Sequence, residues 1–352
     1  MKYSLPLLLV ALALSFGGSA SPCPAQEVES NYGPLPVFEF HSGFWVNLHQ
    51  FLYHQAREKL AVKNSKPGST PVLKQTPISL SPAEQKAWDE AVAYYQSNFA
   101  DKDPQVNIDQ ILLRNQLGDF EDCSELLGKS RRTCDAGLPG NVGVILGAAA
   151  TVYRAHWWQD QDRANRRWVV RVAPLIREQG VGLSQRLADI FQSTWPREKI
   201  RVEICAFAGP AGAFTTLDPL RVTISSTAPR NQGNDSLEVL FHEASHGIAI
   251  PVETAITREC RQRDKPIPRD LWHALIFYTT DEVIRPIMPE APTSVPQEAP
   301  GNKSMPMPPD LNEKLTERGW AEYLRLLHTF WQPYLDGKVT FGDAIAHLVS
   351  AA

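Results

Sequence analysis

The stretch of sequence that decides the fold is Asp235-Ser-Leu-Glu-Val-Leu-Phe-His-Glu-Ala-Ser-His-Gly247. Asp235 or Ser236 is a suitable N-cap, and Glu238 adds an acidic side chain to the first turn, so the stretch predicts a helix. Its apolar side chains share one face, within about 100° of the helix surface: Leu237, Leu240, Phe241, Ala244 and Ile248. We therefore expect one side of this helix to pack into a core while the other side faces a cleft.

The outward side carries an H-E-x-x-H motif formed by His242, Glu243 and His246. Residues four apart on a helix lie about 40° apart around its axis, so both imidazoles can converge on one zinc ion. Glu243 is displaced by about 100° and can reach a water molecule on the metal. Zinc lowers the pKa of such a water to about 7, and a carboxylate can then act as general base. The motif predicts a zinc-dependent hydrolase.

A catalytic zinc needs a third protein ligand, and the sequence offers more than one. The metzincin spacing would place it at Val252, which cannot bind a metal. A second apolar helix over 271–285 carries Glu282, our expected third ligand, with Asp281 as its rival. Tyr278 lies four residues before Glu282 on the same face, so we expect it to bind a substrate carbonyl or an oxyanion.

Two alternatives for this second helix stay open. Glu282 could instead form an ion pair with Arg285, three residues later. His273 lies nine residues before Glu282, about 180° around one straight helix, so it is a candidate for a supporting role only if the helix begins after it or breaks.

The beginning of the chain predicts export. Lys2 precedes the apolar run 5–16, which is followed by the small residues 17–20. This order is typical of a signal peptide over residues 1–20, cleaved between 20 and 26, and the run is too short to span a bilayer. No later segment is apolar enough for a membrane span, so we expect a secreted or periplasmic protein.

Composition limits the remaining classes of function. The 352 residues carry a net charge of −4, which disfavours a nucleic-acid partner. Beyond the signal region four cysteines permit three disulfide pairings, of which Cys123 with Cys134 is the simplest. No pair of cysteines has C-x-x-C spacing, so we expect structural bridges or buried thiols rather than a cysteine-based metal site.

The period of the hydrophobic pattern changes near the middle of the chain, from that of helices to the alternation typical of strands. Residues 27–195 contain mainly helical segments, including a capping box at Ser81 and Glu84. In residues 196–352, alternation at 200–205 and a second strand at 220–225 indicate a small antiparallel sheet. The proline-rich segment 286–309 predicts an extended loop after the second site helix.

These residues resemble the gluzincin branch of H-E-x-x-H zinc metallopeptidases over roughly 199–285. The resemblance implies a zincin-like catalytic unit and does not extend to the helical N-terminal region. We expect an α+β fold in which that region packs on the catalytic unit. The resemblance also implies that the strand Arg221–Ser225 binds an extended peptide by strand addition, and that Glu282 is the third ligand. The N-E-x-x-S-D motif of thermolysin-like members is absent around Glu282.

We therefore expect a zinc metallopeptidase with a peptide or protein substrate. The alternatives are a metal-dependent hydrolase of a non-peptide amide or ester, a non-catalytic zinc-containing envelope or binding protein, and a helical interaction protein in which the motif arose by chance.

Overall fold

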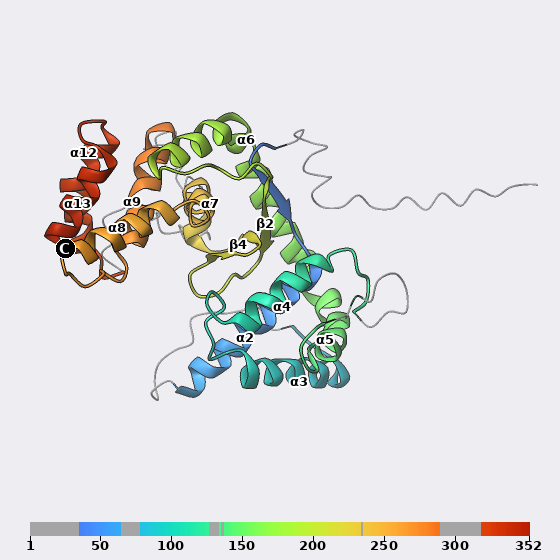
Figure 1. Cartoon of the computed structure of the whole chain (residues 1–352). Helices are drawn as coiled ribbons and strands as arrows, with labels where there is room; N and C mark the ends of the chain where they lie inside the picture. The colour runs from blue at the N-terminus through green and yellow to red at the C-terminus, as the bar shows by residue number, and fades with distance from the viewer. Residues whose placement is uncertain (1–34, 65–77, 127–133, 135–136, 234, 289–317) are drawn as a thin grey trace, which may run out of the picture.

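The computed structural model describes residues 35–64, 78–126, 134, 137–233, 235–288 and 318–352 (Figure 1). The expected signal peptide and residues 289–309 of the proline-rich loop lie outside these ranges. Within them, no helix combines the length and apolar character that crossing a bilayer requires.

The protein is α+β, with a four-stranded sheet at the centre of the molecule (Figure 1). The strands have the order β1-β2-β4-β3, and their bounds are Phe38–His41 (β1), Ile200–Cys205 (β2), Ala213–Leu217 (β3) and Leu220–Ser225 (β4). β1 and β4 both run parallel to β2, and only β3 pairs antiparallel, with β4. The expected antiparallel sheet is therefore wrong: the sheet is mixed, because β4 returns beside β2 only after forming a hairpin with β3.

Alternation along β2 sorts its side chains onto two faces, as the sequence predicts. Ile200, Val202 and Ile204 join the core that lies between the sheet and the C-terminal helices. Cys205, on the opposite face, joins a second core among the N-terminal helices. The sheet therefore separates two apolar cores. The helices α6 (Trp158–Ile190) and α7 (Asp235–Ser245) lie on the side away from the helices α2 (Phe44–Asn64) to α5 (Val142–His156) (Figure 1).

The N-terminal helices form the second core. The predicted capping box is confirmed, because the Ser81 amide donates to Glu84 Oε2 at 2.9 Å and the Ser81 hydroxyl accepts from the Glu84 amide. The helices are α2 (Phe44–Asn64), α3 (Pro82–Asn98), α4 (Ile108–Asp119) and α5 (Val142–His156).

Charged side chains join α4 to the polar face of the sheet. Arg201 of β2 donates to Glu203 Oε1 at 2.6 Å and to Glu121 Oε2 at 2.9 Å. Gly118 lies against this network, because a Cβ atom there would be 2.8 Å from Glu203 Oε1 and 2.9 Å from Arg221 Nη1. A larger residue at this position would force these two charged side chains to shift.

The remaining helices begin with α6 and α7, which pack on the sheet, and end near the C-terminus, away from the sheet (Figure 1). They are α6 (Trp158–Ile190), η1 (Pro229–Asn231), α7 (Asp235–Ser245), α8 (Ile250–Gln262), α9 (Leu271–Ile284), η2 (Arg285–Ile287), α11 (Ala321–Leu326), η3 (Leu327–Trp331), α12 (Gln332–Leu335) and α13 (Phe341–Ala351).

The close cysteine pair is bridged. Cys123 and Cys134 form a disulfide, while Cys205 and Cys260 are buried free thiols. The sequence-based preference for the 123–134 pairing is confirmed.

Candidate metal centre

The predicted motif helix forms as α7, with its apolar residues buried and His242 in its last turn. His246 lies just beyond the end of the helix, where its amide donates to the Glu243 carbonyl at 3.3 Å. Gly247 then brings the chain against the β3–β4 hairpin, since a Cβ atom there would lie 2.7 Å from Leu220 Cδ2. The end of α7 is thereby held against the sheet.

Helix α9 supplies a third imidazole to the two of the motif. His242 Nε2 lies 3.2 Å from His273 Nε2. One potential ligand atom from each of His242, His246 and His273 lies within 4.8 Å of the other two. Among the residues that the structure describes, these three side chains form a group that could hold a metal ion.

The ligand type of this group and one of its N–N separations suit zinc. A tetrahedral zinc ion with Zn–N bonds of about 2.0–2.1 Å holds its nitrogen ligands about 3.3 Å apart, close to the 3.2 Å separation of His242 and His273. Burial lowers the pKa of His246 to about 4, and burial together with the nearby His246 and Arg318 charges lowers the pKa of His273 to about 3. Both imidazoles are therefore neutral at pH 7, the form in which histidine binds metals.

The expected third ligand, Glu282, lies elsewhere. Because α9 begins at Leu271, His273 occupies its first turn and faces α7. Glu282, nine residues later, lies on the opposite side and forms an ion pair with Arg285, as the sequence-based alternative proposed. The structure therefore groups His273, rather than Glu282, with the two histidines of the motif.

The other two candidates on α9 also lie away from the histidines. Asp281 Oδ2 is 3.2 Å from Arg285 Nε. The Tyr278 hydroxyl donates to Gln332 Oε1 at 2.6 Å, on the side of α9 that packs against the C-terminal helices. The structure therefore gives Asp281 an ion pair and Tyr278 a structural hydrogen bond, and it brings neither side chain to the three histidines.

Glu243 is where the motif predicts a general base to be. Its carboxylate Oε2 lies 4.0 Å from His246 Nε2 and 2.7 Å from the Thr215 hydroxyl of β3. Burial raises the pKa of Glu243 to about 7, partly opposed by the Thr215 hydrogen bond and the positive charge of Arg318. A carboxyl group with this pKa can accept and release a proton near neutral pH.

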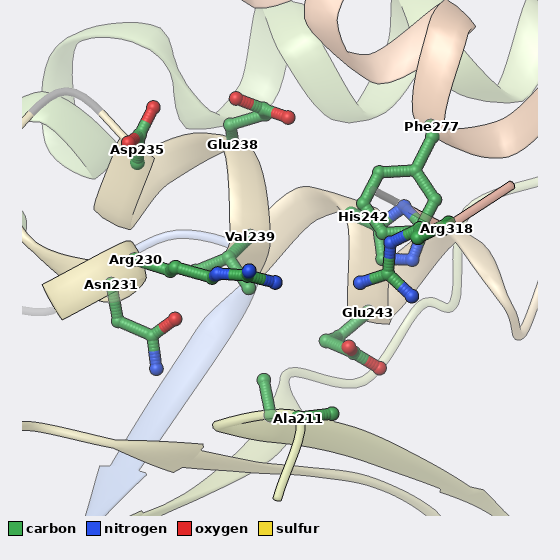
Figure 2. Close-up of a pocket in the computed structure, with 11 residues that line it drawn as sticks. Ala211, Arg230, Asn231, Asp235, Glu238, Val239, His242, Glu243, Phe277 and Arg318 are labelled. Atoms are coloured by element: carbon green, nitrogen blue, oxygen red, sulfur yellow. The ribbon is translucent and has the colours of Figure 1, made fainter. Parts of the chain in front are cut away.

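A small cavity of about 60 Å³ opens beside His242 and Glu243 (Figure 2). Phe277 and Arg318 border it on one side and Arg230 on the other. The remaining lining residues come from the sheet and from the start of α7: Ala211, Ala213, Asn231, Asp235, Glu238 and Val239.

Aromatic rings surround the three histidines and were not identified from the sequence. The Phe277 ring lies 3.7 Å from the His242 ring, centroid to centroid. Trp272 stacks on His273 at 5.1 Å, and Trp320 meets His273 edge-on at 5.2 Å. These rings restrict the orientation of the imidazoles. The signal for one of them was present, because Phe277 follows His273 by four residues and so shares its face.

No protein-family model matches the chain, and neither a curated protein nor a solved structure matches it. The resemblance to gluzincins therefore stays a prediction from the motif.

Proposed function

We propose that the protein is a zinc metallopeptidase in which His242, His246 and His273 hold the metal and Glu243 is the general base. The observation that carries this proposal is the convergence of three imidazoles, from α7, the turn after it and α9, beside one buried carboxyl group. A site that only stabilises the fold needs no such base, and structural zinc sites usually have a fourth protein ligand.

Each residue has a distinct part in the reaction. When bound, zinc would polarise the scissile carbonyl and activate the attacking water. Glu243 takes the proton of that water and passes it to the leaving amine, for which a pKa of about 7 is suitable in both directions. Thr215 orients the carboxylate through its hydrogen bond.

The position of β3 supports an extended peptide as substrate. β3 is an edge of the sheet within the described part of the chain, and its Thr215 contacts Glu243. An exposed edge can pair with a peptide through main-chain hydrogen bonds. The strand we expected in this role, Arg221–Ser225, lies between β2 and β3 and has no open edge. We therefore assign substrate pairing to β3.

Metal content is the first test. We expect about one zinc ion per wild-type chain, and strong loss of zinc in His246→Ala and in His273→Ala. Glu282→Ala is the matched control, because it removes a charged side chain from the same helix on the face away from the histidines. Zinc lost from Glu282→Ala but retained by His273→Ala would restore the original ligand assignment. A folded, zinc-supplemented wild type that binds no metal would contradict the metal centre and favour an interaction protein.

Substrate class needs a separate measurement. Cleavage of a peptide library by the wild type but not by Glu243→Gln is the expected result. Turnover of simple esters or amides without peptide cleavage would favour the non-peptide hydrolase. Zinc binding without any turnover would favour a non-catalytic zinc-containing envelope or binding protein.

We also propose that the protein is secreted or periplasmic, on the basis of the sequence of residues 1–20. N-terminal sequencing of the protein from a culture medium or periplasmic extract should give a first residue between 21 and 27. Recovery of a chain that still begins at Met1 from the cytoplasm would contradict this.

A further inference from the structure

Arg318 stands out among the residues around the cavity, because it was not identified from the sequence. It lies on the side of the cavity formed by α9, and Figure 2 shows its guanidinium directed toward Glu243. Its Cζ atom lies 4.4 Å from the centroid of the Phe277 ring and 5.4 Å from that of Trp320. These two cation–π contacts keep the guanidinium beside the rings of Phe277 and Trp320.

The local backbone explains this position. Gly319 has a φ of +76°, a conformation that favours glycine, and it turns the chain between Arg318 and Trp320. Trp320 packs beside His273 while Arg318 lies over Phe277, which itself contacts His242. The guanidinium is therefore connected to two of the three histidines through aromatic rings.

Arg318 shares the cavity with the proposed catalytic groups. It lines the same cavity as Glu243, the proposed general base, and His242, a proposed ligand. Arg230, Asp235 and Glu238 line other parts of the cavity. Arg318 is also exposed, so an arriving substrate can approach it directly.

We propose that Arg318 is a catalytic residue that binds the carbonyl oxygen of the scissile bond as that oxygen becomes negatively charged. This inference rests on the proposed function. The water oxygen forms a bond to the carbonyl carbon, the π electron pair moves onto the carbonyl oxygen, and the water proton moves to Glu243. When the electron pair returns, the C–N bond breaks and the nitrogen receives the proton from Glu243, which gives a carboxylic acid and an amine.

A guanidinium suits this role for physical reasons. It stays charged at all relevant pH values and donates two parallel hydrogen bonds. Removing one preorganised donor that is directed at the developing charge lowers the rate about a hundredfold or more. The hydroxyl of Tyr278, which we first expected to act here, is instead engaged with Gln332.

The test compares an anionic with a neutral ligand of the same metal. Cobalt-substituted protein is titrated with acetohydroxamate and, separately, with imidazole, and binding is followed by the visible spectrum. In Arg318→Ala we expect acetohydroxamate to bind about tenfold to a hundredfold more weakly, while imidazole affinity and cobalt content stay as in the wild type. Arg318→Lys should recover part of the lost acetohydroxamate affinity, since lysine restores the positive charge but not the pair of parallel hydrogen bonds.

Arg325→Ala is the matched control, because it removes an equal charge from an exposed residue of α11. We expect it to bind both ligands like the wild type. Equal weakening of both ligands in Arg318→Ala would show a structural role and overturn the inference, as would unchanged acetohydroxamate binding. Failure of the wild type to take up cobalt or zinc would overturn the proposed function first, so the two failures are distinguishable.

With a substrate in hand, Arg318→Ala should lower kcat about a hundredfold or more at little change in KM. Guanidinium ion added to this variant should restore part of the rate. A rise in KM at constant kcat would assign Arg318 to ground-state binding and contradict the role in the transition state.

Discussion

Replacing Glu243 with glutamine should stabilise the metal-free protein at pH 8. The buried Glu243 carboxyl has a pKa of about 7 in the folded protein, compared with 4.5 in an unfolded chain. The difference of about 2.5 pKa units corresponds to about 3 kcal/mol, since each unit is worth about 1.4 kcal/mol. Glutamine has nearly the same shape and no charge, so Glu243→Gln removes this unfavourable ionisation.

The sign and the pH range follow from the two pKa values. Below pH 4.5 the carboxyl is protonated in both states, and the variant should gain little. Between pH 4.5 and about 7 the unfolded chain loses the proton while the folded protein keeps it, so the stability of the wild type falls as pH rises. Above about pH 7 both states are ionised, and the advantage of Glu243→Gln should level off near 3 kcal/mol.

Urea unfolding followed by tryptophan fluorescence, at several pH values between 4 and 8 and with a chelator present, measures this difference. Glu282→Gln makes the same change of charge on the outer face of α9 and controls for effects of net charge. A difference between Glu243→Gln and the wild type that does not grow with pH would refute the reasoning. It would mean that solvent reaches the Glu243 carboxyl in the free protein.

Three further predictions concern residues outside the metal centre. The double variant Cys123→Ser, Cys134→Ser should lose about 3 kcal/mol of unfolding free energy, as expected for opening a loop of this size, measured by urea unfolding under non-reducing conditions. Gly118→Ala should lose about 1–3 kcal/mol, because its Cβ would displace two charged side chains, whereas Gly182→Ala on α6 meets no neighbour within 4 Å and should be neutral or slightly stabilising. Tyr278→Phe should lower stability by about 1 kcal/mol and leave kcat unchanged, and a large fall in kcat would return this hydroxyl to the active site.

The sequence predicted local structure where one segment contains its own signal. The capping box at Ser81 and Glu84 is complete within four residues, and the alternation of 200–205 shows both faces of β2. β1 was missed because it has only four residues, Phe38–His41, and its partner β2 begins more than a hundred residues later. The mixed direction of the sheet was missed for the same reason, since it depends on pairing between distant strands.

In the candidate site, too, the residues that share a local signal were predicted, and those that depend on packing between helices were not. His242, Glu243 and His246 were identified because their spacing on one helix fixes their relative directions. His273 and Glu282 both lie on α9, on opposite sides, and either could have met the motif. Apolar residues surround α9 on most sides, so the hydrophobic pattern did not indicate which side faces α7. The packing of α9 against α7 determines which side of α9 faces the motif, and no local feature of the sequence indicates this packing.

One physical cause connects the chemistry of the site with its stability. Burial between α7, α9 and the sheet keeps His246 and His273 neutral and raises the pKa of Glu243 to about 7. Neutral imidazoles bind zinc well, but a buried Glu243 destabilises the metal-free fold above that pH. A cation held by the three histidines would offset this cost, because its positive charge favours the ionised carboxylate. The stabilisation by zinc should therefore be larger at pH 8, where Glu243 is ionised, than near pH 5, where the carboxyl group of the metal-free protein holds a proton.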